Sequence, residues 1–203
     1  MLKIWGRGNS VNVQKVLWAV DEIGLPHERV NAGREFGVVD TPEYAALNPN
    51  RLVPTIDDDG FILWKSNVIV RYLWQKHRPP MSPRAFAEAD RWMEWYSTTF
   101  WDAAMRTVFW GLVRTPPEKR DLAAIEAARK KTGELLAIVD AALAQRPYLS
   151  GDAFGMGDIP LGCGVWRWYA LDIERPKLPH LDAWFARLKE RAAYAKNVML
   201  PLS

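Results

Sequence analysis

The sequence is poor in the residues that carry redox and metal chemistry. A single cysteine, Cys163, excludes an internal disulfide and a CxxC redox pair. The three histidines, His27, His77 and His180, form no metal-ligand spacing, so we expect no metal site. No apolar run approaches the roughly 20 residues of a membrane helix, and the opening MLKIWGRGN lacks the apolar core of a signal peptide. The sequence therefore predicts a cytoplasmic protein without a membrane segment.

An excess of charge of one sign is also missing. The chain has 27 Lys and Arg against 24 Asp and Glu, a net charge of +3, and the basic residues are scattered rather than clustered. Scattered basic residues argue against nucleic acid as the main partner. The sequence contains no glycine-rich phosphate loop and no pair of carboxylates that suggests hydrolase chemistry.

Tryptophan, in contrast, is abundant. The chain has 11 tryptophans, and 49% of its residues are hydrophobic. Each indole buries a large area, so we expect most of them in the core. A length of 203 residues is enough for one large domain or two small ones with cores of their own.

Short strands alternate with helices over the first eighty residues. A stripe of valines and a leucine after residue 12 repeats with helical spacing and stops before Gly24, and Asp59-Gly60 suits a hairpin turn. The resulting order is β-α-β-α-β-β-α. In sequence order the elements are LKIW (2–5), the helix around 13–20, HERV (27–30), TPEYAAL (41–47), VPTI (53–56), FILW (61–64) and the helix after Ser66.

The pattern changes after residue 78. The stretch HRPPMSPRA (77–85) carries three prolines and no periodicity, which is typical of a linker. Only helical spacings follow, in four apolar stripes. We therefore predict an α/β domain over 1–78, a linker over 79–84 and an all-α helical bundle over 85–203. The stripes are Phe86, Ala89, Met93, Tyr96 and Phe100; Thr132, Leu136, Val139 and Leu143; Ile159, Gly162, Cys163 and Trp166; and Leu181, Trp184, Phe185 and Leu188.

Ser66 and Asn67 stand between the strand FILW and a helical pattern, which allows two interpretations. Serine and asparagine are favoured helix N-caps, so Ser66 can simply start the helix. A helix N-terminus that carries a hydroxyl is also a seat for an anion. The same choice applies to Ser10 and Asn12 at the start of the first helix.

Four segments in this order resemble the cytosolic glutathione transferases of the serine type. NSVNVQKVLWAVDEIGL (9–25) is similar to their first helix, and NPNRLVPTI (48–56) to the segment that holds the family's cis-proline. KSNVIVRYL (65–73) is similar to the segment that holds the γ-glutamyl end of glutathione. GDAFGMGDIPLG (151–162) is similar to a helix start of the second domain, with Asp158 in the capping-box position. The resemblance implies a thioredoxin-like first domain and an all-helical second domain.

The resemblance assigns Ser10 as the catalytic residue that donates a hydrogen bond to the glutathione thiolate. A free thiol has a pKa of about 8.5, and lowering it by about two units takes about 2.7 kcal/mol of thiolate stabilisation. One hydroxyl bonded to a charged acceptor supplies about 1.5–3 kcal/mol, and the helix N-terminus adds up to about 1 kcal/mol. Asn9 and Asn12 are the other polar side chains in reach, and the sequence alone does not exclude either of them as the donor.

The resemblance also implies a set of residues that bind glutathione. It implies a cis Val53–Pro54 bond that turns the Val53 N–H and C=O towards the peptide backbone of glutathione. Ser66 is expected both to cap its helix and to bind the γ-glutamyl carboxylate. The predicted set is Ser10, Asn12, Arg51, Leu52, Val53, Pro54, Lys65 and Ser66.

Two of these residues depart from the family pattern. Lys65 stands where the family has an acidic residue or glutamine that faces the γ-glutamyl amine, and an ammonium cannot accept a hydrogen bond. Arg51 stands where a small residue is usual. One hypothesis is that both cations turn to the carboxylates of the ligand. The alternative is that Lys65 points to solvent or pairs with Asp57, Asp58 or Asp59.

In the second domain, spare aromatic residues predict an apolar wall for an electrophile, with Trp110, Trp166 and Tyr169 as its candidates. The leading interpretation is a homodimeric glutathione transferase that joins reduced glutathione, a co-substrate, to apolar electrophiles and needs no other cofactor. The alternatives are a non-catalytic ligand-binding protein of the same fold and a glutathione-dependent peroxidase.

Overall fold

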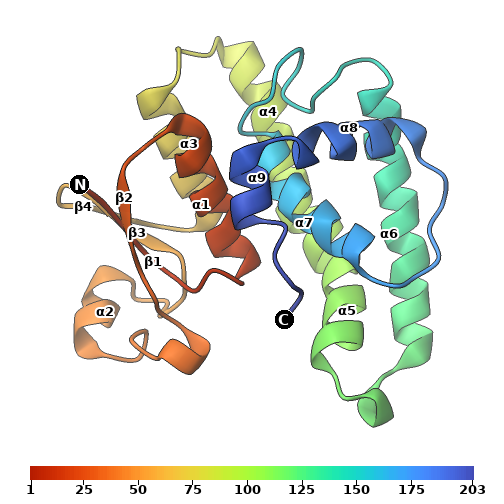
Figure 1. Ribbon diagram of the computed structural model, residues 1–203, viewed down its shortest axis with the longest axis horizontal. Coiled ribbons are helices and arrows are strands. Elements are labelled where there is room, and N and C mark those ends of the chain that lie inside the picture. Colours follow the sequence, from red (N-terminus) through yellow and green to blue (C-terminus); the bar gives the residue numbers. More distant parts are fainter. The chain divides into compact units, whose positions relative to one another are not determined.

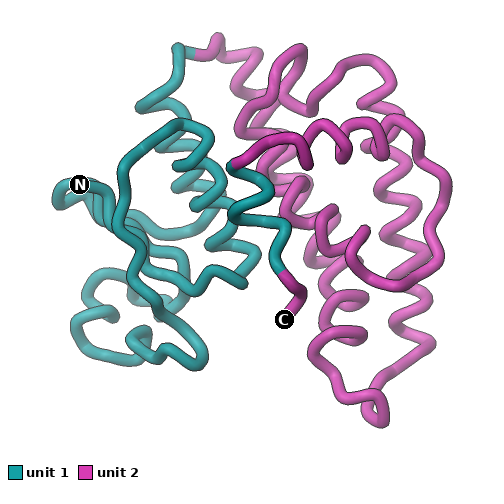
Figure 2. The backbone as a smooth tube through the Cα atoms, in the orientation of Figure 1, with its two compact units in different colours: residues 1–80, 193–200 teal, residues 81–192, 201–203 magenta.

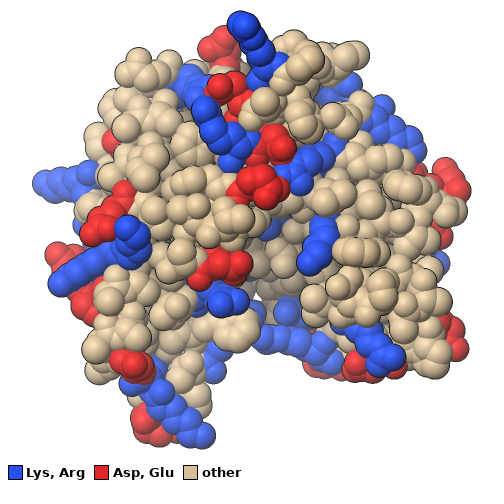
Figure 3. Space-filling view, turned by 180° about the vertical axis from the view of Figure 1, so that it is seen from behind, with Lys and Arg blue, Asp and Glu red and all other residues tan.

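The computed structural model describes all residues, 1–203, which fall into two compact units (Figure 2). The first unit comprises residues 1–80 and 193–200, and the second comprises residues 81–192 and 201–203. None of the helices combines the length and the apolar character needed to cross a membrane. Lys and Arg side chains are interspersed with Asp and Glu over the face drawn in Figure 3.

The first unit is built on a four-stranded sheet in the order β2-β1-β3-β4. The central strand β1 is parallel to β2 and antiparallel to β3, which pairs antiparallel with β4. Ile4 of β1 and Ile56 of β3 face each other in the register and are fully buried. The strands are β1 (Leu2–Trp5), β2 (His27–Val30), β3 (Thr55–Asp58) and β4 (Phe61–Trp64).

Three of the predicted strands are confirmed, and the third strand of the chain is displaced. The sequence predicted it over 53–56, but β3 runs from Thr55 to Asp58. Pro54 has no N–H to donate to a neighbouring strand, so the ladder begins only after it. Asp59 and Gly60 form the predicted two-residue turn to β4, with φ values of 52° and 93° that suit a left-handed hairpin turn.

Three helices accompany the sheet (Figure 1). Helix α1 (Val11–Ile23) ends at Gly24, whose φ of 81° is the left-handed conformation that glycine adopts without a steric cost. Helix α2 (Pro42–Leu47) is capped as predicted by the hydroxyl of Thr41, which accepts from the Tyr44 N–H. Helix α3 (Ser66–His77) packs against α1 through its buried stripe. A short 3-10 turn, Arg34–Phe36, precedes α2.

The first unit also includes a late segment of the chain, residues 193–200. Tyr194 is fully buried, and its ring meets that of Trp18 edge-on at 4.6 Å between centroids. Asn197 and Lys196 both bind Asp21 of α1, at 2.7 and 2.8 Å. The sequence did not predict that a segment so late in the chain belongs to the first unit.

The second unit is all helical, as predicted, and each predicted stripe lies on one helix or on one continuous helical stretch. The expectation that most tryptophans lie in the core is wrong, because only five of the 11 in the whole chain are buried: Trp18, Trp74, Trp92, Trp168 and Trp184. Residues 96–105 and 110–114 are wound as π-helix, a local widening that apolar spacing does not reveal. The elements are α4 (Pro83–Trp95), the π-helical Tyr96–Met105, α5 (Arg106–Phe109), the π-helical Trp110–Arg114, a 3-10 turn (Pro117–Lys119), α6 (Leu122–Leu143), α7 (Asp158–Ala170), α8 (Pro179–Lys189) and α9 (Ala192–Asn197), whose last five residues belong to the first unit.

Candidate functional site

The first unit contains a pocket of about 90 Å³ between the start of α1, the segment before β3 and the start of α3. Six of the eight residues predicted for the binding site line it. Ser10 and Arg51 do not line it, and three further residues do. The lining residues are Asn12, Asn48, Asn50, Leu52, Val53, Pro54, Trp64, Lys65 and Ser66.

Ser66 is the first helical residue of α3, so the prediction that it caps the helix is wrong. Lys65 occupies the cap position with a φ of 75°, and its side chain makes no capping hydrogen bond. The Ser66 hydroxyl donates instead to Asn12 Oδ1 of α1 at 3.3 Å. Because no side chain caps α3, the positive end of its dipole lies open beside the pocket. Of the two interpretations of Ser66, the geometry therefore favours anion binding.

Ser10 occupies the N-cap position of α1 and is 8% exposed. Its hydroxyl makes no capping bond and no other hydrogen bond within the chain, although its carbonyl accepts the first helical bond from Gln14. The amide oxygens of the other two candidates are engaged, because Asn9 Oδ1 accepts from Arg7 and Asn12 Oδ1 accepts from Lys15 and Ser66. Among the three candidates, Ser10 is the one whose side chain is uncommitted.

A buried polar network holds the segment in front of β3. The Leu52 carbonyl accepts hydrogen bonds from Tyr44 Oη and Asn48 Nδ2, both at 2.8 Å. The hydroxyl of Thr55 bonds to the same two side chains, at 2.8 and 3.0 Å. Burial raises the pKa of Tyr44, so its phenol stays protonated at neutral pH. This network fixes the two residues that follow, Val53 and Pro54, whose shared peptide bond is cis as the sequence resemblance implied.

Sequence reasoning did not assign Asn48, Asn50 and Trp64 to the site, although Asn48 and Asn50 lie within the segment 48–56 and Trp64 ends the predicted strand 61–64. Asn48 follows the last residue of α2, and its Oδ1 accepts from both the N–H and the side chain of Asn50. An asparagine at the end of a helix is an ordinary turn signal, so its spacing carried no indication of the hydrogen bonds to Leu52 and Thr55.

Truncating Asn48 tests whether this network stabilises the fold. Asn48→Ala leaves the buried Thr55 hydroxyl with one partner fewer, and we expect the free energy of unfolding to fall by about 1–3 kcal/mol. The urea midpoint measures the loss. Asn50→Ala is the matched control, because Asn50 is exposed and its loss is expected to cost less than about 0.5 kcal/mol. Equal midpoints for the two variants would contradict the role of Asn48.

Lys65 and Arg51 are exposed, take positive φ values of 75° and 53°, and take part in no ion pair. The three carboxylates of the β3–β4 hairpin are all bound elsewhere. Asp57 accepts from the Gly60 N–H, Asp58 from Tyr72 and Lys76, and Asp59 from the amino group of Met1. The interpretation that Lys65 pairs with one of them is therefore wrong. Lys65 is the single charged residue that lines the pocket, and no carboxylate lines it.

The three aromatic candidates for an electrophile pocket lie in the second unit, and they do not form one group. Tyr169 stacks on Phe185 with ring centroids 4.4 Å apart, and Trp166 packs on the same ring at 6.5 Å. Trp110 is 49% exposed and lies under the Arg114 guanidinium at 5.1 Å. Trp166 and Tyr169 thus share a neighbour that Trp110 does not contact.

The first unit combines a thioredoxin-like sheet with a cis-proline and a helix N-terminus without a side-chain cap, and these features agree with the glutathione transferases that the sequence resembles. Comparisons with known proteins agree with this class. Residues 9–76 match the family model of the glutathione S-transferase N-terminal domain, and residues 100–192 match that of the C-terminal domain. The chain belongs to the glutathione S-transferase family.

Individual relatives are similar over the whole chain. The chain is 45% identical to the glutathione S-transferase GstB of Escherichia coli over 209 residues, with 100% of both proteins covered. It is 30% identical to glutathione S-transferase 3 of Zea mays, with 97% of this chain and 93% of the relative covered. The crystal structure of a theta class glutathione S-transferase from Xanthomonas axonopodis pv. citri, with glutathione bound, superposes with a TM-score of 0.94 at 52% identity and covers 100% of this chain and 99% of its own.

Proposed function

We propose that this glutathione S-transferase uses Ser10 to stabilise the thiolate of reduced glutathione, which then attacks a small apolar electrophile. The observation that carries the proposal is the Ser10 hydroxyl, which is nearly buried at the N-terminus of α1 and makes no hydrogen bond within the chain. A hydroxyl in that position can donate to an anion while the helix dipole adds to the stabilisation. Ser10 acts as a hydrogen-bond donor and forms no covalent bond.

The pocket beside α1 holds the rest of the tripeptide in this proposal. Ser66 and the backbone N–H groups at the start of α3 bind the γ-glutamyl carboxylate. The N–H and C=O of Val53 pair with the cysteinyl backbone. Lys65, the charged residue of the pocket, turns to a ligand carboxylate. This arrangement is supported by the exposure of Lys65 and by its freedom from any ion pair.

The electrophile is small and apolar, and it binds to aromatic residues of the helical unit in this proposal. Trp166 and Tyr169 remain the candidates, together with Trp110. We propose a homodimer in the cytoplasm as the working form. Light scattering of the purified protein tests the assembly, and a mass of one chain would contradict it.

Calorimetric titration with reduced glutathione tests the proposed function, followed by an assay with a chloronitrobenzene as the electrophile. We expect a dissociation constant at or below about 1 mM, which corresponds to about 4 kcal/mol of binding free energy. Binding together with turnover supports the proposal. Binding without turnover of any electrophile would instead favour the ligand-binding alternative, and absence of heat at several times that concentration would exclude the peptide site.

A charge reversal at Lys65 tests its proposed role. Lys65→Glu places a negative charge beside the ligand carboxylates, so we expect glutathione binding to weaken about tenfold, or about 1.4 kcal/mol. Titration of the variant measures the change. Lys177→Glu is the matched control, because Lys177 is an exposed lysine of the other unit that forms no ion pair. Tighter binding by Lys65→Glu would show that Lys65 hinders the ligand.

A further inference from the structure

We propose that Lys15 is a positioning residue that supplies a buried positive charge behind the carboxylate subsite at Ser66. The inference rests on the proposed function, because it names the group of glutathione that this charge recognises. Lys15 is 2% exposed, although lysine side chains normally keep their ammonium in water. Lys15 lies in the second turn of α1 and does not itself line the pocket.

The contacts of Lys15 join the two helices that meet at the pocket. Its ammonium donates to Asn12 Oδ1 of α1 at 3.0 Å and to Asn67 Oδ1 of α3 at 3.4 Å. Asn67 is 8% exposed and follows Ser66 directly in the chain. The Ser66 hydroxyl donates to the same Asn12 oxygen at 3.3 Å. The Lys15 ammonium and the Ser66 hydroxyl, which is proposed to bind the ligand carboxylate, therefore donate to the same oxygen atom.

This arrangement also sets the orientation of the Asn12 amide. An amide group presents an acceptor oxygen on one side and a donor nitrogen on the other. Two donors, Lys15 and Ser66, hold the oxygen of Asn12, so its Nδ2 group is left for the pocket that Asn12 lines. When Ser66 turns its hydroxyl to a ligand, Lys15 still keeps Asn12 in this orientation. Asn12 then offers a donor, which suits an anion.

The charges around the pocket favour the same ligand chemistry. Apart from Lys65, the residues that line the pocket are neutral, and none of them is a carboxylate that would repel a bound anion. Coulomb attraction strengthens where water is excluded, so a buried cation acts on a bound anion more strongly than an exposed one at the same distance. A carboxylate at Ser66 gains this attraction, whereas a neutral amide in its place does not. Lys15 therefore selects ligands with a negative charge at this end.

The experiment compares two ligands on variants of Lys15. The ligands are glutathione and its analogue in which the α-carboxylate of the γ-glutamyl residue is a carboxamide. Lys15→Gln keeps a hydrogen-bond donor for Asn12 but removes the charge, and Lys15→Arg keeps the charge. We expect Lys15→Gln to weaken glutathione binding about tenfold or more and to change binding of the carboxamide by less than about twofold. Lys15→Arg is expected to keep most of the preference for the carboxylate.

Calorimetric titration measures both affinities, with Lys177→Gln as the control for removing a lysine from an exposed place. If Lys15→Gln lost the same affinity for both ligands, Lys15 would only support the fold, and the inference would be overturned. Unchanged affinity of Lys15→Gln for glutathione would also overturn it. If Lys15→Gln does not fold, Lys15→Met provides the neutral variant, because an apolar side chain needs no partner in a buried place. Wild-type protein that binds neither ligand would overturn the proposed function itself, whereas binding without a carboxylate preference would overturn only this inference.

Discussion

Ser10→Ala is expected to lower turnover with glutathione about threefold to thirtyfold near neutral pH while leaving glutathione affinity nearly unchanged. The hydrogen bond from a hydroxyl to a charged sulfur is worth about 1.5–3 kcal/mol, which corresponds to about one to two units in the pKa of the bound thiol. If the wild-type enzyme lowers the thiol pKa from about 8.5 to about 6.5, losing this bond reduces the thiolate fraction at pH 7 from about three quarters to between about a quarter and a few per cent. The loss therefore appears in kcat rather than in KM.

Two measurements check this prediction. The ultraviolet absorbance of the thiolate, followed against pH, gives the pKa of the bound thiol directly, and steady-state kinetics give the loss of turnover. Ser10→Thr keeps the hydroxyl and is expected to retain most of the activity. Unchanged kinetics in Ser10→Ala would remove Ser10 from the mechanism and turn attention to the side-chain amides of Asn9 and Asn12.

The structure also separates a catalytic role of Ser10 from a capping role. An N-cap serine that accepts a hydrogen bond contributes about 1 kcal/mol to stability, but the Ser10 hydroxyl accepts none. Ser10→Ala should therefore leave the urea midpoint close to that of the wild type. A large loss of stability together with lost turnover would indicate that the serine serves the helix rather than the thiolate.

Periodicity and turn residues were sufficient to predict most of the fold. The valine stripe before Gly24 predicted α1, and Thr41-Pro42 predicted the start of α2. These signals are local, because a helix or a tight turn is decided within a few residues. The end of the chain could not be assigned in this way. Tyr194 joins the first unit through its contact with Trp18, and sequence spacing carries no information about a contact across that distance.

In the candidate site, too, the residues of short local segments could be predicted, whereas contacts between distant segments could not. The segments around Pro54 and Ser66 predicted five pocket-lining residues, and the segment of the first helix predicted the sixth, Asn12. The cap position of α3 was assigned one residue too late, since Lys65 takes a left-handed φ that nothing in its residue type indicates. The contact between Lys15 and Asn67, 52 residues apart, appears only when α1 and α3 pack together.

A large loss of stability is expected when Asp158 is replaced. Asp158 lies at the start of α7 and is fully buried. Its Oδ1 accepts from the Leu149 N–H at 2.8 Å and from Trp184 Nε1 at 2.9 Å. Its Oδ2 accepts from the N–H groups of Ser150 and Gly155, at 3.3 and 3.1 Å. The bond from Gly155 has the three-residue spacing of a capping box, but Gly157 occupies the N-cap position and Asp158 is the first helical residue rather than the third, so the predicted capping-box position is wrong. Burial raises the pKa of Asp158, and these donors oppose that effect by stabilising its charged form.

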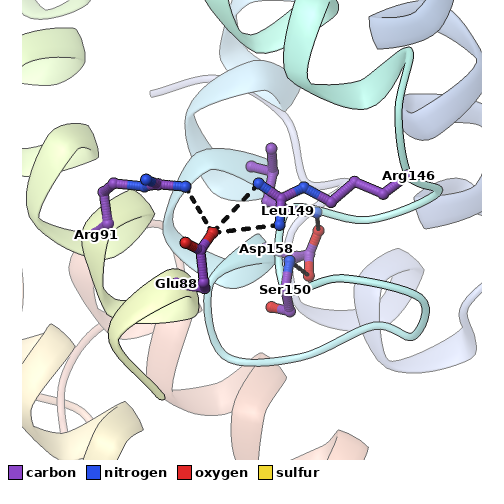
Figure 4. A network of polar contacts seen from close by, with 6 residues as sticks. All are labelled: Glu88, Arg91, Arg146, Leu149, Ser150 and Asp158. Atoms are coloured by element: carbon purple, nitrogen blue, oxygen red, sulfur yellow. Dashed lines mark hydrogen bonds and ion pairs between the residues drawn. The ribbon is translucent and has the colours of Figure 1, made fainter. Parts of the chain in front are cut away.

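The surrounding loop, residues 144–157, depends on this carboxylate (Figure 4). Leu149 and Ser150 lie in the middle of the loop and point their N–H groups at Asp158. Arg146, near the start of the loop, binds Glu88 of α4 at 3.4 Å, and Glu88 also binds Arg91 at 2.6 Å. The Glu88 contacts are partly exposed, so they contribute little, and the buried Asp158 provides the main attachment.

Asp158→Ala is therefore expected to lower the free energy of unfolding by at least about 3 kcal/mol, because it leaves several buried donors without partners at about 1–3 kcal/mol each. The urea midpoint of the purified variant measures the loss of stability. If little folded protein can be recovered, the loss is larger than the midpoint can measure. Asp152→Ala is the matched control, since Asp152 lies on the same loop, is exposed and makes no hydrogen bond or ion pair. Similar midpoints for the two variants would show that the loop is held by Glu88 and Arg146 instead. In that case Glu88→Ala should produce the loss that Asp158→Ala did not.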